Sequence, residues 1–304
     1  MSYQHMVVES GESLPLPVVR KITVADLKEA LRKGLDDFWA MPTHVIFLSI
    51  IYPLIGILLA RLTFSYSVLP MLFPLAAGFA LVGPFAAIGL YELSRRREQN
   101  DDTAWEDALG VLQSRSLLGI LALGGLLMFI FLVWLATAQA LYVATFGYKP
   151  AATIPDFVDQ LFTTRAGWTL MIVGNSIGFL FAALVLAISV VSFPLLLDRD
   201  VGAVVALITS VRAVLKNPVT MALWGLLVAA LLVIGSLPLF LGLAVVLPVL
   251  GHATWHLYRH VVEGGPPPRL DDVRRPPRPR HYAAQFPAGL FAGDISPGGD
   301  ETRR

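Results

Sequence analysis

The sequence predicts an all-α membrane protein with six transmembrane helices, cytoplasmic amphipathic helices and probable parallel internal repeats. Of its 304 residues, 56% are hydrophobic and only 15% are charged, whereas soluble domains carry about 25% charged residues. The apolar residues form continuous blocks close to the length of about 20 residues that a bilayer core requires. Segments rich and poor in Lys and Arg alternate between these blocks, as in multi-span proteins.

We expect three regions along the chain. Residues 1–22 form a polar leader without the basic-then-apolar pattern of a cleavable signal peptide, so the first span is expected to act as an uncleaved anchor. Residues 23–263 form the six-span membrane domain. Residues 264–304 are rich in Pro, Gly and Arg and cannot bury a core. This tail is expected to be disordered and cytoplasmic, with its basic residues able to contact anionic lipid.

Residues 23–39 predict an amphipathic helix, capped by Thr23 and ended by Pro42. Its apolar face is expected to contain Val24, Leu27, Ala30, Leu31, Leu35, Phe38 and Trp39. Such a helix next to a span most simply lies in the interface plane, and the alternative is a soluble helix packed on a loop. Three further segments, 103–114, 201–215 and 154–162, also have an apolar side.

Six apolar blocks predict the transmembrane helices. They run from Thr43 to Leu62, Val68 to Leu93, Leu117 to Val143, Gly167 to Pro194, Val219 to Gly235 and Leu237 to Tyr258. Only a short turn joins the last two, which therefore form a hairpin. Of the 23 Lys and Arg residues, all but Arg61, Lys149 and Arg165 fall on one side if both termini are cytoplasmic. This count predicts a multi-pass protein with both termini in the cytoplasm.

The first and last parts of the chain resemble each other. Superposing Pro42 on Pro218 aligns the two amphipathic helices, and superposing Pro84 on Pro248 aligns two spans that end alike. The second superposition matches Tyr91 with Trp255, Glu92 with His256, and Arg95 with Arg259. Each unit starts and ends on the same side, which predicts parallel repeats. The middle pair of spans, ending at residues 193–199, is a candidate for a degenerate third unit.

Histidines near the end of the last span are the main candidates for a site. His252, His256 and His260 lie four residues apart and so share one helix face. Two imidazoles at this spacing can share a metal, with His44 or Glu92 as the third ligand. The alternative is structural, because Trp255 and Arg259 belong to an aromatic and basic interfacial belt and a helix C-terminus favours His.

Other polar residues suggest structure more than chemistry. Glu92 stands close to Arg95 and is expected to pair with an arginine at the membrane boundary. Asn175, Ser176 and Gln139 are expected to form hydrogen bonds between helices. No charged residue lies at mid-span, which argues against an ion-coupled pump. The sequence has no cysteine, phosphate-binding glycine loop or nucleophile elbow, so no catalytic residue is predicted.

Two stretches of the sequence, residues 77–98 and 251–259, resemble the domain-of-unknown-function 2189 family of bacterial integral membrane proteins. The similarity covers roughly residues 24–263. It implies an uncharacterised inner-membrane protein and supplies no activity, cofactor or catalytic residue.

The predicted function is therefore non-enzymatic. We expect a scaffold, or a sensor or carrier for a small or lipid-like ligand, with the lipid bilayer as its partner. No cofactor and no nucleic acid are expected, and association with itself or another protein is left open. The alternative is a redox, metal or haem protein that uses His252 and His256.

Overall fold

The computed structural model describes residues 16–41, 74–75, 83–85, 87–99, 105–148, 154–238 and 241–263. These residues all belong to one compact unit, Met1–Gly264. The predicted first span, most of the second, and the predicted tail lie outside the described residues. Regular structure in the described part is helical, with one isolated antiparallel bridge between Val19 and Val262.

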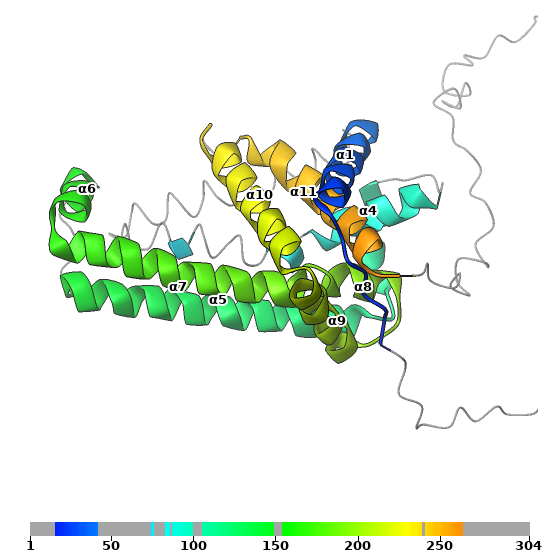
Figure 1. The fold of residues 1–304 in the computed structure, drawn as a ribbon, viewed down its shortest axis with the longest axis horizontal. Coiled ribbons are helices and arrows are strands. Elements are labelled where there is room, and N and C mark those ends of the chain that lie inside the picture. Colours follow the sequence, from blue (N-terminus) through cyan, green and yellow to red (C-terminus); the bar gives the residue numbers. More distant parts are fainter. Residues whose placement is uncertain are drawn as a thin grey trace, which may run out of the picture. The chain divides into compact units, whose positions relative to one another are not determined.

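The helices follow the predicted order along the chain (Figure 1). They are α1 (Val24–Ala40), α4 (Ile88–Glu98), η2 (Trp105–Gln113), α5 (Leu117–Phe146), α6 (Ile154–Thr163), α7 (Arg165–Ser189), α8 (Ser192–Asp198), α9 (Ala203–Lys216), α10 (Pro218–Ser236) and α11 (Leu243–Val261).

Among the described residues, three stretches are long and apolar enough to cross a membrane: Leu117–Phe146, Arg165–Asp198 and Pro218–Ser236. Helices α5 and α7 lie side by side, with α6 at one end (Figure 1). Large apolar side chains such as Phe129 and Phe179 are exposed on them, as expected for surfaces that face lipid. Helix α11 is not among these stretches, so the predicted six spans stay a prediction.

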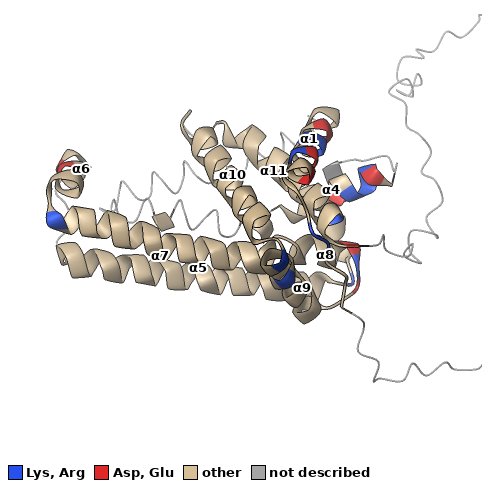
Figure 2. Cartoon of the chain, viewed as in Figure 1, with Lys and Arg blue, Asp and Glu red and all other residues tan. Residues whose placement is uncertain are grey.

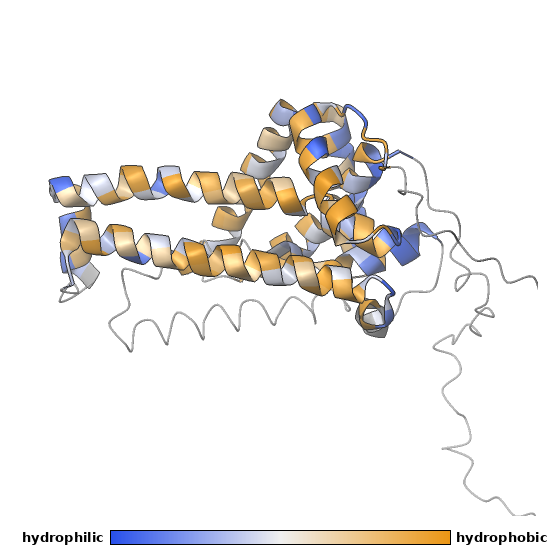
Figure 3. Cartoon of the chain, turned by 90° about the horizontal axis from the view of Figure 1, so that it is seen from below, coloured by the Kyte–Doolittle hydropathy of each residue, from blue (hydrophilic) through white to orange (hydrophobic). Residues whose placement is uncertain are grey.

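Charge is segregated to one end of the described helices. Figure 2 shows basic and acidic residues on α1 and α4 and basic residues on α9, while α5, α7 and α10 are almost free of charge along their length. At the opposite end the charges are those of α6 and Arg165, at the start of α7 (Figure 2). Hydrophobic colour runs along the long helices in Figure 3. This distribution agrees with helices that cross a bilayer. We call the charged end, which contains α1, α4 and α9, the head region.

The fourth predicted span is not one continuous helix. Helix α7 ends at Ser189, and after Val190 and Val191 the chain starts α8. The Val191 N–H donates to Ser210 Oγ of α9 at 3.2 Å, which satisfies a backbone donor at the break. The prediction that the span ends at Pro194 is wrong, because Pro194 is the third residue of α8, in the first turn where proline is tolerated.

Helix α1 begins as predicted, with Thr23 and Asp26 forming a capping box. Its buried stripe differs from the predicted apolar face: it contains Leu27, Ala30, Gly34, Asp37 and Phe38. Leu35 and Trp39 are 42% and 68% exposed. The apolar residues are therefore divided between a packed stripe and an exposed strip, because neighbouring helices cover only one side of α1.

The second predicted amphipathic segment forms a 3-10 helix, η2. Ala108 and Val111 are buried three residues apart, which matches the three residues per turn of this helix type. Leu112 is 65% exposed, although a helical period of 3.6 residues would place it on the same side as Ala108. The tighter turn of the 3-10 helix rotates Leu112 away from Ala108, so a period of 3.6 residues does not describe the buried side of η2.

The amphipathic helices pack on other helices of the same unit, and α1 packs on one that is distant in sequence. Helix α1 packs on α11, η2 on α4, and α9 on α7 and α8, while α4, α8 and α11 also contact one another. Helices α1 and α11 approach closely at Gly34, where an added Cβ would lie 2.6 Å from the backbone nitrogen of Ala253. Only glycine permits this approach.

Residues before α1 connect the first and last parts of the unit. The Arg20 N–H donates to the Val261 carbonyl at 2.7 Å, and the Glu263 N–H donates to the Val18 carbonyl at 2.9 Å. Asn217, at the junction of α9 and α10, accepts from the Ile22 N–H at 2.9 Å. The start of α1 is therefore fixed at both α11 and α9.

The α1–α11 contact predicts a strong effect of one methyl group. Gly34→Ala should lower the free energy of unfolding by about 1–3 kcal/mol, because its Cβ would overlap the α11 backbone. Gly125→Ala is the matched control, since nothing lies within 4 Å of its added Cβ. Thermal denaturation in detergent measures both. Equal midpoints for the two variants would contradict the close α1–α11 packing.

Candidate functional site

A buried polar cluster lies where α1, α4 and α11 meet. The Asp37 cluster consists of Asp37, Ser94, Arg97, His252 and His256. Asp37 Oδ2 accepts from Ser94 Oγ at 2.6 Å and lies 2.9 Å from His256 Nε2. Arg97 pairs with the other carboxylate oxygen, Oδ1. One carboxylate therefore joins α1 to both α4 and α11.

Hydrogen-bond geometry fixes the direction of the protons in the Asp37 cluster. Ser94 Oγ lies 2.7 Å from His252 Nδ1 and 2.6 Å from Asp37 Oδ2. A hydroxyl has one proton, and the carboxylate can only accept. The Ser94 proton therefore points to Asp37, and His252 donates its Nδ1 proton to Ser94.

This arrangement differs from a catalytic triad. In a triad, histidine accepts the serine proton and the carboxylate binds the other imidazole nitrogen. Here His252 donates to Ser94, and the same Nδ1 lies 4.0 Å from Asp37 Oδ2. Asp37, Ser94 and His252 are all nearly inaccessible to solvent. The cluster therefore holds the helices together instead of activating the hydroxyl.

The Glu92 cluster, made of Glu92, Arg95, Arg96 and Asp107, joins α4 to η2. Glu92 accepts two hydrogen bonds of 2.8 Å from Arg95 and one of 2.7 Å from Arg96. Arg96 also pairs with Asp107 of η2 at 2.7 Å. Glu92 therefore pairs with arginines, as predicted, and the pairing continues to a second carboxylate.

The Asp198 cluster, made of Asp198, Glu98, Trp255, Tyr258 and Arg259, joins α8, α4 and α11. Tyr258 donates to Asp198 at 2.5 Å, and Trp255 donates to Glu98 at 3.2 Å. Arg259 lies 3.1 Å from Glu98 and 3.6 Å from Asp198. The predicted candidates Trp255 and Arg259 thus contact carboxylates of two other helices.

The predicted histidine face turns toward α1. His252 and His256 approach Asp37, while His260 Nδ1 lies 3.7 Å from Asp26 Oδ1. Helices α1 and α11 therefore run antiparallel. His44, the predicted third ligand, lies outside the described residues. Within the described part of the chain, no three His, Cys, Asp or Glu residues are arranged to hold a metal ion.

Sequence reasoning missed Asp37, Ser94 and Asp198. A signal for Asp37 was present, because it falls on the same stripe of α1 as Leu27, Ala30 and Gly34. An acidic residue on a packed stripe indicates a buried partner. Ser94 and Asp198 carry no such signal in their local sequence.

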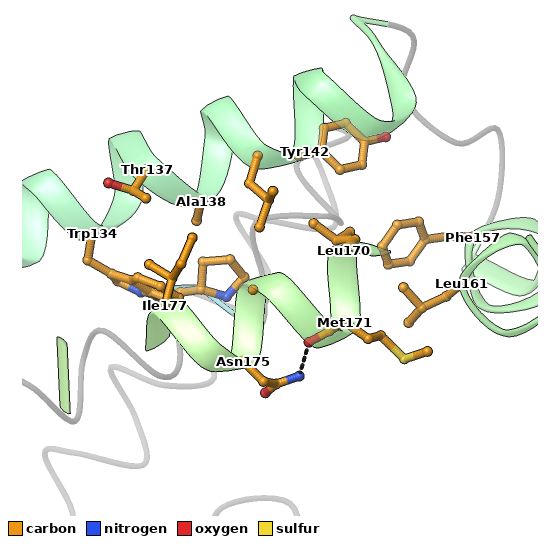
Figure 4. Close-up of a pocket in the computed structure, with 13 residues that line it drawn as sticks. Trp134, Thr137, Ala138, Tyr142, Phe157, Leu161, Leu170, Met171, Asn175 and Ile177 are labelled. Carbon is orange, nitrogen blue, oxygen red and sulfur yellow. Dashed lines mark hydrogen bonds between the residues drawn. The ribbon is translucent and has the colours of Figure 1, made fainter. Parts of the chain in front are cut away.

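An apolar cavity of about 300 Å³ lies between α5 and α7, near α6 (Figure 4). Its lining residues are Pro74, Trp134, Thr137, Ala138, Leu141, Tyr142, Phe157, Leu161, Leu170, Met171, Gly174, Asn175 and Ile177. Asn175 and Thr137 bond to carbonyls of their own helices, at 2.7 Å in each case. Ser176 does the same at 2.8 Å, so the hydrogen bonds described for Asn175 and Ser176 lie within α7, and the bonds expected between helices stay a prediction.

The pKa of Asp37 lies below its usual range. Burial of the carboxylate acts to raise this pKa, but hydrogen bonds from His256 and Ser94 and nearby positive charge outweigh the effect. The folded protein therefore favours the ionised form of Asp37.

Comparison with known proteins supports membrane location. Residues 72–198 match the family described as predicted integral membrane protein (DUF2189), which confirms the predicted resemblance over this region. The matched region contains α4, η2, α5, α6, α7 and α8. No curated protein and no solved structure matches the chain.

The Asp37 cluster predicts a large effect of a nearly isosteric change. Asp37→Asn should lower the free energy of unfolding by about 3 kcal/mol. Arg97 would lose its carboxylate partner, and the N–H groups of the new amide would point toward other hydrogen-bond donors. Asp36→Asn is the control, since Asp36 is half-exposed and its pair with Arg32 should contribute less than about 1 kcal/mol. Thermal denaturation at pH 7 measures both.

Lowering the pH provides a second measurement of the same variant. A carboxylate whose folded pKa is depressed stabilises the protein above its unfolded pKa, and this contribution is lost as pH falls through the folded value. The gap in denaturation midpoint between wild type and Asp37→Asn should therefore narrow below about pH 4. An unchanged gap under acid conditions would contradict ionised Asp37 as the source of stability.

Proposed function

We propose that this integral membrane protein is a non-enzymatic scaffold of a bacterial inner membrane. It has several spans, and both of its termini are cytoplasmic. One observation carries this proposal. The charged candidates that the structure describes are paired with protein groups: Glu92 and Arg95 bind each other within α4, while His256 binds Asp37 of α1 and Arg259 binds Glu98 of α4. A catalytic site or ion path would need such groups to face a substrate or a water-filled space.

The burial of these groups supports a structural role. Glu92 is 3% exposed, His252 is fully buried, and Trp255 is fully buried. Taking charges out of water costs several kcal/mol per ion, and complete pairing is needed to offset that cost. The three clusters meet this requirement by linking α1, α4, η2, α8 and α11.

We infer that the scaffold consists of three parallel units. Each unit has an amphipathic helix, a span away from the head region and a return helix that ends in the head region. Each return helix carries an aromatic residue two positions before a leucine, and all six residues are at most 2% exposed. These pairs are Tyr91 and Leu93, Phe193 and Leu195, and Trp255 and Leu257.

A second regularity supports the same division. Two positions before each aromatic residue, the return helix meets the amphipathic helix of the following unit. The meeting pairs are Gly89 with Ala108, Val191 with Ser210, and Ala253 with Gly34. The third pair joins the last unit to the first. The units therefore form a closed ring, in which each amphipathic helix packs on its neighbour's return helix.

The ends of two amphipathic helices also agree in backbone conformation. Met41 after α1 has φ −129° and ψ 46°, and Asn217 after α9 has φ −128° and ψ 50°. Both residues stand immediately before a proline. This agreement supports the predicted relation between the first and last units.

The redox or metal alternative receives no support from the geometry of His252 and His256. His256 Nε2 contacts Asp37, and Arg97 already provides a positive charge for that carboxylate. His252 Nδ1 is used by Ser94. These two nitrogens are therefore bonded to different protein groups, and His252 Nε2 is buried without a hydrogen-bond partner among the described residues.

Parallel units predict which loops lie on each side of the membrane. Because the chain contains no cysteine, single cysteines at Gln99, Asp200, Tyr148 and Ser236 can be labelled without a background. A membrane-impermeant maleimide added to spheroplasts should label Tyr148→Cys and Ser236→Cys. It should label Gln99→Cys and Asp200→Cys only after the membrane is permeabilised.

Labelling of Asp200→Cys in intact spheroplasts would contradict parallel units, because α8 and α9 would then lie outside.

Metal analysis and a visible spectrum of the same purified protein test the non-enzymatic assignment. We expect a colourless, metal-free protein. Stoichiometric metal that is lost on His256→Ala would instead support the redox alternative.

A further inference from the structure

We propose that the cavity between α5 and α7 binds one acyl chain, from a membrane lipid or a free fatty acid. Its volume of about 300 Å³ lies at the lower end of the range for ligand sites. The site goes beyond the scaffold proposal and stands without it, since no residue of the three polar clusters lines the cavity.

The chemistry of the walls selects hydrocarbon. Ten of the lining residues have aliphatic or aromatic side chains that can pack against a methylene chain: Pro74, Trp134, Ala138, Leu141, Tyr142, Phe157, Leu161, Leu170, Met171 and Ile177. The hydroxyl hydrogen of Thr137 and one amide hydrogen of Asn175 are used within their own helices. A water molecule would need two to four polar partners. A hydrocarbon chain needs none.

Aromatic residues shape the cavity at two levels. Trp134 donates to the Pro74 carbonyl at 2.9 Å and packs against Phe181, with ring centroids 5.5 Å apart. Near α6, Tyr142 packs against Phe146 and Phe157. These contacts fix both side chains, so the cavity has defined walls instead of a surface that can collapse.

The location of the cavity between two apolar helices indicates that its ligand comes from the membrane. Its walls belong mainly to α5 and α7, two of the stretches long and apolar enough to cross a bilayer. An empty space there would leave wall atoms without dispersion partners. Acyl chains are the apolar molecules available at that depth. Helix α6, with Phe157 and Leu161 on the cavity side, covers the end away from the charged head region (Figure 4).

Photolabelling of the purified full chain tests this site. The probe is a palmitic acid that carries a diazirine on its chain, followed by peptide mapping. We expect saturable labelling in residues 134–142 and 170–177. Competition by unlabelled palmitic acid would identify free fatty acid as the occupant, and competition only by a diacyl phospholipid would identify a membrane lipid.

Filling the cavity should abolish this labelling. Gly174→Trp introduces a large side chain at the cavity wall, and Leu170→Trp is an independent variant at a second lining position. Ile172→Trp is the matched control, because Ile172 is 62% exposed and does not line the cavity. We expect loss of saturable labelling in the two cavity variants and full labelling in the control, at similar denaturation midpoints.

Labelling that does not saturate, or that is equal in Gly174→Trp and Ile172→Trp, would overturn the proposal. Either result would show that the probe reaches α5 and α7 only as general lipid at the protein surface. If Gly174→Trp fails to fold, Leu170→Trp provides the same comparison with the control.

Discussion

The ionised carboxylate of Asp37 is the constraint on which the head region depends. Its burial on α1 is costly, since a charge removed from water costs several kcal/mol unless it is paired and hydrogen-bonded. Asp37 obtains its partners from two other helices: Ser94 and Arg97 from α4, and His256 from α11. Helix α1 can therefore bury its packed stripe only where α4 and α11 already lie together. The close approach of Gly34 to Ala253 brings the carboxylate within reach of these partners.

The same principle extends through the other clusters. Glu92 is satisfied by Arg95 and Arg96, and Arg96 in turn holds Asp107 of η2. Asp198 of α8 accepts from Tyr258 of α11. Because lipid gives no hydrophobic driving force between spans, polar pairs at the membrane boundary can decide which helices meet. In the proposed ring such pairs join α1 to α11 and α4 to η2, while α8 meets α9 at the hydrogen bond from Val191 to Ser210. The apolar cavity lies between the parts of α5 and α7 that these pairs do not reach.

The sequence predicted much of the architecture because long apolar blocks and capping signals are local. The ends of α5, α9 and α10 fall within three residues of their predicted positions, and Thr23 caps α1. The break between α7 and α8 was not predictable, since its buried backbone donor, the Val191 N–H, is satisfied by Ser210, which lies 19 residues away. The histidine face was predicted, but its partner Asp37 lies more than 200 residues earlier. Partners at such separations depend on packing that no local pattern specifies.

Cross-linking tests most directly whether the first and last units of a single chain pack against each other. Arg20 and Glu263 form an exposed pair at 3.0 Å, so replacing both with cysteine should cost little stability. A protease site at Asp200 then separates the first two units from the third. After treatment with a short bis-maleimide and cleavage, the two fragments of Arg20→Cys/Glu263→Cys should remain joined on a denaturing gel. Separate fragments, or links only between different chains, would contradict a ring closed within one molecule.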